Sequence, residues 1–239
     1  MKLPSPPGER ARERGIVLAV CLCLAACAPT SVAPSIIRLQ PPRDRDSEFQ
    51  FGVRTGPRLT AVTQSENAGG FNPAVGGTMP PELGAAYELD YTHVVWRQLA
   101  VHGGVQAEFF GGLPLPALGV AAGVSYRWQA GVFSIAPAIA GRGATSFGFD
   151  LVGGAGHILS ADLSLTLSAA GSDRARVGLV PFASVQHTLG PNVTSVLFGA
   201  LVVMRFEAVE VFGGVGRAWI SPAGPSWNVP LVGVRVGGS

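Results

Sequence analysis

Residues 161–168 read ADLSLTLS, and this short stretch decides the fold. Leu163, Leu165 and Leu167 alternate with a polar residue at every intervening position. Successive side chains of an extended strand point to opposite faces, so this segment has one apolar face and one polar face. The same period of two recurs along the chain after residue 47, and no segment carries a helical stripe.

The alternating segments are long. We predict strands at residues 48–62, 81–94, 98–110, 117–128, 131–142, 147–157, 161–170, 176–187, 193–205, 208–220 and 229–237. Soluble strands usually run about five or six residues, whereas a tilted strand that crosses a bilayer needs about nine to eleven. Bacterial single-chain barrels have an even number of strands, so one segment is expected to be wrong. The segments after residue 193 are the weakest, because both of their faces are apolar.

We therefore predict an all-β fold, an antiparallel up-and-down transmembrane β-barrel of about ten strands, with eight or twelve as the alternatives. The composition supports it. Only 13% of the residues are Asp, Glu, Lys or Arg, against about a quarter in typical soluble domains. The mean hydropathy is +0.35, yet no apolar run after the first residues is long enough for a membrane helix. A closed barrel is the other structure that a bilayer permits. The net charge of +2 is too small to indicate a nucleic-acid partner.

The first residues resemble the export signal of bacterial lipoproteins. A basic start precedes the apolar stretch GIVLAVCLCL at residues 15–24, which is too short to span a bilayer. Leu24-Ala25-Ala26-Cys27 then matches the lipobox of that family at each position. The resemblance implies cleavage before Cys27 and acylation of Cys27, as by palmitate, which anchors the chain in the outer membrane of a Gram-negative cell. Its partners would be outer-membrane lipid and the lipoprotein-processing and barrel-assembly machinery. An ordinary signal peptide is the alternative.

Three parts follow from these patterns. Residues 1–26 are predicted to be the signal peptide, residues 27–47 an acylated N-terminus with a flexible Pro-rich tether, and residues 48–239 the barrel domain. Residues 64–79 form the longest predicted loop and would lie outside the cell, whereas residues 96–98, 129–130 and 189–192 are predicted tight turns. The domain resembles small outer-membrane barrels, which serve as anchors, adhesins or narrow channels. It departs from them because it ends in VRVGGS without a terminal aromatic residue.

The polar faces of the predicted strands carry charges of both signs. In a narrow lumen, such charges are expected to pair with one another. We predict that Arg54, Glu88, Asp90, Glu108 and Arg127 point inward and pair across neighbouring strands. The whole predicted lumen network consists of Arg54, Arg58, Glu88, Asp90, His102, Glu108, Arg127, Arg142, Asp150 and Asp162. The network predicts a structural or narrow-channel role, with a small selective pore lined by these charges as the alternative.

Some small outer-membrane barrels are enzymes, namely lipid A deacylases with a Ser–His pair or proteases with Asp and His near the outer rim. The candidates of this type are His93, His102, His157, His187, Asp150, Ser160 and Asp162. Residues 156–162 are interpreted as a solvated turn, and His102 as a hydrogen-bonded lumen histidine. We therefore predict a protein that is not an enzyme, without catalytic residues, cofactor or metal.

Two other functions stay open from the sequence. One is a periplasmic lipid-tethered β-barrel that binds a small apolar ligand, in which Leu163, Leu165 and Leu167 would face inward. The other is an outer-rim hydrolase acting on lipid or peptide, which requires a Ser or Asp within hydrogen-bond reach of a histidine near the long loops.

Overall fold

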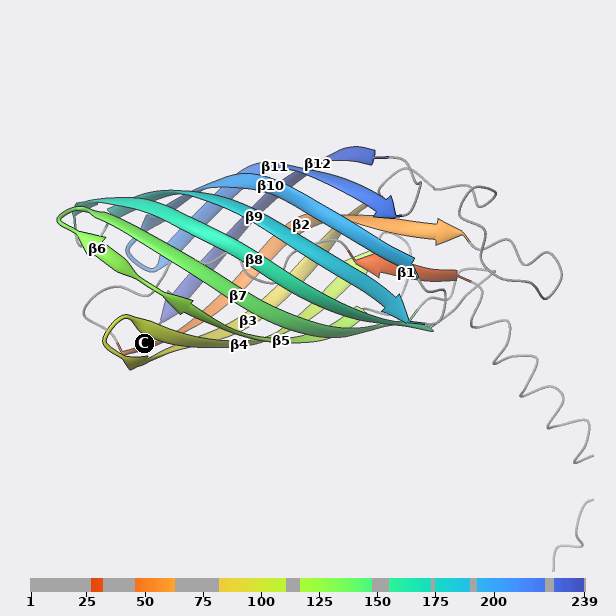
Figure 1. Ribbon diagram of the computed structural model, residues 1–239, viewed down its shortest axis with the longest axis horizontal. Helices are drawn as coiled ribbons and strands as arrows, with labels where there is room; N and C mark the ends of the chain where they lie inside the picture. The colour runs from red at the N-terminus through yellow and green to blue at the C-terminus, as the bar shows by residue number, and fades with distance from the viewer. Residues whose placement is uncertain are drawn as a thin grey trace, which may run out of the picture.

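A single β-sheet closed on itself makes up the domain (Figure 1). The computed structural model describes residues 27–31, 46–62, 82–110, 117–147, 155–172, 175–189, 193–221 and 226–238. In these ranges, no helix is long and apolar enough to cross a membrane.

The strands are long, and each ring strand is antiparallel to the next. Their bounds are β1 Cys27–Ser31, β2 Ser47–Val62, β3 Glu82–Trp96, β4 Leu99–Phe110, β5 Ala117–Tyr126, β6 Trp128–Ala130, β7 Phe133–Phe147, β8 Ala155–Ser172, β9 Ala175–Leu189, β10 Val193–Phe206, β11 Val209–Ser221 and β12 Ser226–Gly238. β12 pairs with β2 and closes the ring, while β6 continues the line of β5 along β7. The predicted antiparallel barrel of 10 strands is confirmed.

The surplus predicted strand lies near residue 157, not after residue 193. Residues 155–172 form the single strand β8, and Phe147 ends β7; the rest of the predicted strand 147–157 lies outside the described residues or within β8. Lumen-facing Ile158 is buried and His157 is exposed, so the polarity of the two faces is inverted at this end of β8. That inversion hid the continuity of the strand. It also shows that the expected turn at residues 156–162 is wrong.

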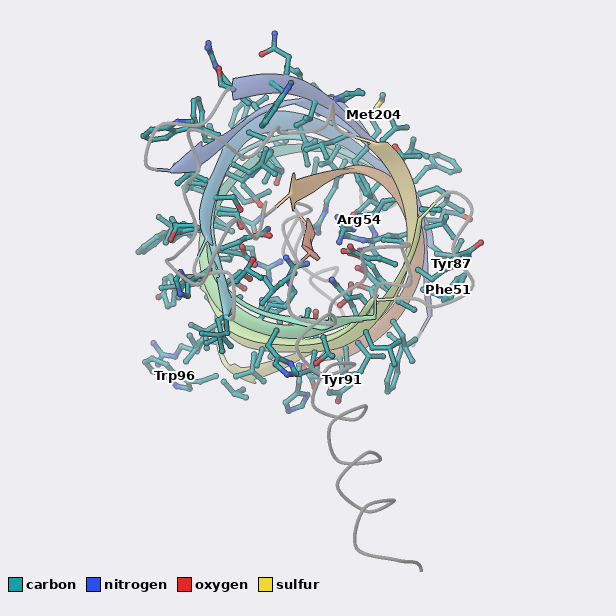
Figure 2. The ribbon with its side chains drawn as sticks, turned by 90° about the vertical axis from the view of Figure 1, so that its right-hand side faces the viewer. Phe51, Arg54, Tyr87, Tyr91, Trp96 and Met204 are labelled. Carbon is teal, nitrogen blue, oxygen red and sulfur yellow. The ribbon has the colours of Figure 1, made fainter. Side chains whose placement is uncertain are left out.

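The outer face of the barrel is apolar. Figure 2 looks along the barrel and shows Phe51, Tyr87, Tyr91, Trp96 and Met204 pointing outward from the wall. Leu163, Leu165 and Leu167 are also exposed, at 58%, 36% and 37%. A closed barrel with this apolar exterior is the membrane-spanning type. The apolar-ligand barrel is therefore wrong, because it required these three leucines inside.

The two halves of the lumen are filled by different kinds of side chain. Inside β9 to β12, apolar side chains pack into a core that consists of Val180, Phe182, Leu197, Leu201, Val203, Phe212, Ala218, Val229 and Leu231. Inside β2 to β8, most buried side chains are polar or charged. The apolar half explains why both faces are apolar in the sequence after residue 193.

One rim carries two-residue turns. Arg97, Gly131 and Glu207 begin these turns with φ values of 46°, 58° and 52°, the left-handed conformation that matches tight hairpins. We call this the short-turn rim. The turn predicted at residues 129–130 lies at Gly131–Val132, because residues 128–130 form β6. The predicted long loop at residues 64–79 and residues 190–192 of the predicted turn lie outside the described residues.

Part of the expected tether is ordered. β1 pairs with the end of β2, Cys27 opposite Val62 and Ser31 opposite Arg58. β1 also lies against β7, β8 and β9 and therefore crosses the mouth opposite the short-turn rim (Figure 1). The ladder of β2 with β12 ends at Thr55 and that with β3 ends at Arg58. Beyond those points the β2 backbone needs another partner, and β1 supplies it. A wholly flexible tether over residues 27–47 is thus wrong for residues 27–31.

Candidate functional site in the barrel lumen

The centre of the lumen is a row of charges that crosses the closure of the ring. In the strand register, Arg235 of β12 lies opposite Gly52 of β2, and Gly52 lies opposite Glu88 of β3. Arg235 Nη2 reaches over Gly52 to Glu88 Oε2 at 3.1 Å, and its Nη1 lies 3.1 Å from Glu210 Oε1 on β11. A Cβ atom on Gly52 would lie 2.7 Å from Arg235 Cγ. The glycine therefore makes room for the arginine.

Arg54 joins this row to the next strands. Its Nε donates a hydrogen bond to Glu88 Oε1, and its Nη2 lies 3.7 Å from Glu108 Oε1 on β4. Gln106 Nε2 donates to the same Glu108 oxygen at 3.0 Å. All four side chains are buried, and Figure 2 shows Arg54 inside the ring. Burial of paired charges requires such additional hydrogen bonds, because desolvation of each ion is costly.

The charges continue across β5 to the far wall. Arg142 Nη1 of β7 lies 3.7 Å from Glu108 Oε1, although β5 separates the two strands in the sheet. β5 presents small residues at its inward positions Gly119, Ala121 and Gly123, so side chains from β4 and β7 can meet above it. Arg142 Nε then donates to Ser160 Oγ on β8 at 3.3 Å. The pairs form one chain from β11 to β8.

Two further groups extend the polar half of the lumen. Glu48 of β2 accepts two hydrogen bonds from the Arg205 guanidinium of β10, one of them at 3.1 Å. Asp162 of β8 accepts hydrogen bonds from Ser184 of β9 and from Ser160, the latter at 3.4 Å. We call the buried ion pairs of the lumen the lumen ion-pair network. It consists of Glu48, Arg54, Glu88, Glu108, Arg142, Arg205, Glu210 and Arg235.

The structure places most predicted lumen residues inside. The buried ones are Arg54, Glu88, Asp90, His102, Glu108, Arg142 and Asp162. Arg127 is only half-buried near the short-turn rim, where its N–H donates to Gln98 O at 3.0 Å. Arg58 contributes its backbone to the pairing with β1, and its side chain lies outside the described residues, as does Asp150.

Four charged residues of the network were absent from the prediction: Glu48, Arg205, Glu210 and Arg235. Glu48 and Arg235 share the phase of inward residues in their own strands, so alternation alone could have found them. Arg205 follows inward Leu201 and Val203, and no polar neighbour marks its face. Its partner lies 157 residues away in the chain.

A histidine and a serine meet inside the wall near the short-turn rim. His102 Nε2 of β4 lies 2.6 Å from Ser125 Oγ of β5. His102 Nδ1 lies 2.9 Å from Thr92 Oγ1 of β3. All three are buried, and the register sets Thr92 opposite His102 and His102 opposite Gly123. The absence of a side chain at Gly123 leaves room for the imidazole to approach Ser125, two residues further along β5.

The other candidate histidines lie on the outer face or near it. His157 is exposed and lies 3.1 Å from Thr145 Oγ1, whereas Ser160 and Asp162 point inward, so the three do not form a site. His187 Nδ1 lies 3.0 Å from Thr194 Oγ1. His93 stacks on Tyr91 with ring centroids 6.3 Å apart. Among the described residues, no group of His, Cys, Asp or Glu could hold a metal ion.

Comparison with known proteins identifies solved barrels but no sequence relative. No family model and no curated protein matches the chain. LpxR from Salmonella typhimurium is 8% identical, with 79% of this chain and 99% of that chain covered and a TM-score of 0.45. The NanC porin is 10% identical, with 80% of this chain and 98% of that chain covered and a TM-score of 0.37. A loop L8 deletion mutant of OmpT, an outer-membrane protein of Vibrio cholerae, is 10% identical, covers 81% and 98%, and has a TM-score of 0.34.

The prediction that this chain is not an enzyme is corrected. The distance expected for a hydrolase is found, because His102 lies within hydrogen-bond reach of Ser125. The expected position near the long loops is wrong, because this pair lies near the short-turn rim. A closed barrel of this kind therefore does not exclude catalysis.

Proposed function

We propose that this chain is a lipid-anchored outer-membrane barrel whose lumen is closed to free passage of solutes, with a structural role or that of a narrow gate. One observation carries the proposal: ion pairs and hydrogen bonds cross the lumen from β11 to β8. The apolar core inside β9 to β12 fills the remaining half. Among the described residues, the paired charges of one half and the packed apolar side chains of the other occupy the space that a porin leaves as a wide polar channel.

The anchor rests on the lipobox that ends at Cys27. In β1, Cys27 lies opposite Val62 and thus at the rim away from the short turns. Acyl chains on Cys27 in this position would enter the membrane next to that rim. Stable attachment needs two hydrophobic signals, and the barrel wall itself provides the second.

Planar-bilayer recording tests the closed lumen. We expect no steady conductance from the wild-type protein. Arg54→Ala and Glu88→Ala remove side chains from the centre of the network and should create intermittent or steady conductance. A matched control is Arg217→Ala, because Arg217 bonds Ser226 Oγ at 2.8 Å in an exposed position outside the network.

The membrane location is tested separately. Membrane fractionation combined with heat-modifiable gel migration should retain the protein in the outer-membrane fraction and shift it on boiling. Large, steady wild-type conductance would overturn the closed lumen, and full release by high-salt washing without a migration shift would overturn the membrane barrel.

A further inference from the structure

The outer wall contains an apolar groove of 750 Å³. Exposed Val124, Ile139, Leu163 and Leu165 line it on the membrane side. The groove is continuous with the apolar belt around the barrel, so its surroundings are the acyl chains of membrane lipids. Its lining also includes residues at the alternate positions of these strands, whose side chains point to the lumen, and Ser125 is one of them. The lining of the groove therefore includes residues from both faces of the sheet.

Two prolines lie where the strand pairing beside this groove is interrupted. Pro137 of β7 and Pro181 of β9 both line the groove and flank Leu165 of β8. Proline has no N–H and cannot donate to the ladder, and proline is unusual inside a sheet for this reason. The β8–β9 ladder accordingly skips from Ser164 to Leu167. The β5–β7 ladder ends at Ser125, and pairing with β7 resumes only at Trp128 of β6.

Ser125 is thus the residue at which the groove, the gap in the ladder and His102 meet. Its Oγ lies 2.6 Å from His102 Nε2, and Thr92 Oγ1 lies 2.9 Å from Nδ1 of the same ring. In the tautomer with the proton on Nδ1, that N–H donates to Thr92 and Nε2 accepts the Ser125 proton. This is the arrangement of a nucleophile, a base and a group that orients the base.

The depth of Ser125 in the membrane suits an ester. Ser125 lies opposite Ala100, close to the turn at Arg97–Gln98. Tyr126 and Trp128 pack nearby with ring centroids 4.7 Å apart, and such aromatic residues mark the membrane interface. Lipid ester carbonyls lie at this interface, whereas their acyl chains extend into the hydrocarbon core. A chain lying in the groove would bring its ester to the level of Ser125.

From these observations, we propose that Ser125 and His102 hydrolyse an acyl ester of a diacyl phospholipid whose chain lies in the groove. This activity is additional to the closed-barrel role proposed above. It rests on that proposed function in one respect, namely that the barrel lies in the outer membrane. Thr92 is a positioning residue, because its hydroxyl bonds the His102 ring rather than the reacting atoms.

The reaction uses water as its co-reactant. The Ser125 Oγ–carbonyl bond forms while the hydroxyl proton moves to His102 Nε2. The ester C–O bond then breaks, and the departing lipid alcohol takes that proton, which leaves an acyl group on Ser125. Water attacks this acyl group and gives a proton to Nε2. The Oγ–acyl bond breaks, Ser125 recovers the proton, and the products are a fatty acid and a lysophospholipid.

The test uses the full chain inserted into phosphatidylcholine vesicles that contain a fluorogenic phospholipid ester. We expect fatty-acid release from the wild type and a loss of at least about 100-fold in Ser125→Ala and His102→Gln, as for removal of a general base. Ser134→Ala is the control, because this serine does not line the groove. Its Oγ lies 2.7 Å from Ser168 Oγ. Thr92→Val should lower kcat and displace the pH profile, which a merely structural role would not do.

Two further readouts keep the test decisive if a variant folds poorly. A fluorophosphonate should label the wild-type protein at Ser125. Ala183→Trp, which fills the groove, should reduce hydrolysis of a long-chain lipid ester but spare a short-chain soluble ester. A correctly inserted wild-type protein that releases no fatty acid and takes no label would overturn the proposal, as would equal release by Ser125→Ala. The gel-migration shift reports insertion independently, so failure of the barrel is distinguishable from failure of this site.

Discussion

Glu88 is the carboxylate on which the lumen ion-pair network converges, and Glu88→Gln tests the network directly. The substitution keeps the size of the side chain but removes its charge from between Arg54 and Arg235, all buried. Loss of one partner from a buried pair costs about 3–5 kcal/mol. Arg235 keeps Glu210 at 3.1 Å and Arg54 keeps Glu108 at 3.7 Å. We therefore expect the lower end, about 3 kcal/mol.

For a domain of about 150–250 residues, each kcal/mol shifts Tm by about 2–4 °C, so Glu88→Gln should lower it by about 6–12 °C. The assay is denaturant unfolding from vesicles followed by tryptophan fluorescence, with heat-modifiable migration for Tm. Glu207→Gln, in an exposed turn, is the matched control and should stay within about 0.5 kcal/mol of wild type. A Glu88→Gln protein as stable as this control would refute the argument that the buried pairs hold the lumen together.

Three shorter predictions concern the wall, the lumen and the anchor. Gly233→Ala should destabilise the barrel by about 1–3 kcal/mol through overpacking, because the new Cβ would lie 2.2 Å from Phe212 Cζ. Gly103→Ala is the control and should leave the stability unchanged, because a Cβ there would meet no atom within 4 Å. Equal unfolding midpoints for the two variants would contradict the prediction. Val215→Arg, at an exposed position in the middle of β11, should cost about 2–4 kcal/mol and reduce the fraction that inserts into vesicles. Cys27→Ser should abolish incorporation of labelled palmitate, and a labelled variant would disprove the anchor.

Strict alternation made the outer face predictable. At Leu163, Leu165 and Leu167 every intervening residue is polar, and the structure exposes all three leucines. The continuity of β8 was not predictable in the same way, because buried Ile158 and exposed His157 invert the pattern. Binary patterning assigns a face only where the two faces differ.

The contacts within the lumen depend on register and on space, which local sequence does not show. Ser125 and His102 are 23 residues apart and meet because of the β4–β5 register. Arg235 reaches Glu88 only because the intervening strand places Gly52 between them. Neither partner could be chosen from spacing alone, although each residue could be assigned to a face.

The reach of Arg235 over Gly52 has a consequence for assembly. β2 and β12 come from opposite ends of the domain, so the ring can close only after nearly all of the domain has been synthesised. Contacts between such distant segments form slowly, since the long intervening chain must first be ordered. The ion pair between Arg235 of β12 and Glu88 of β3 crosses the line where β12 meets β2 and joins two strands that are not neighbours in the sheet. This ion pair can form only when β12 has paired with β2, and we expect Gly52→Ala to slow closure of the barrel while its hairpins still form at their normal rate.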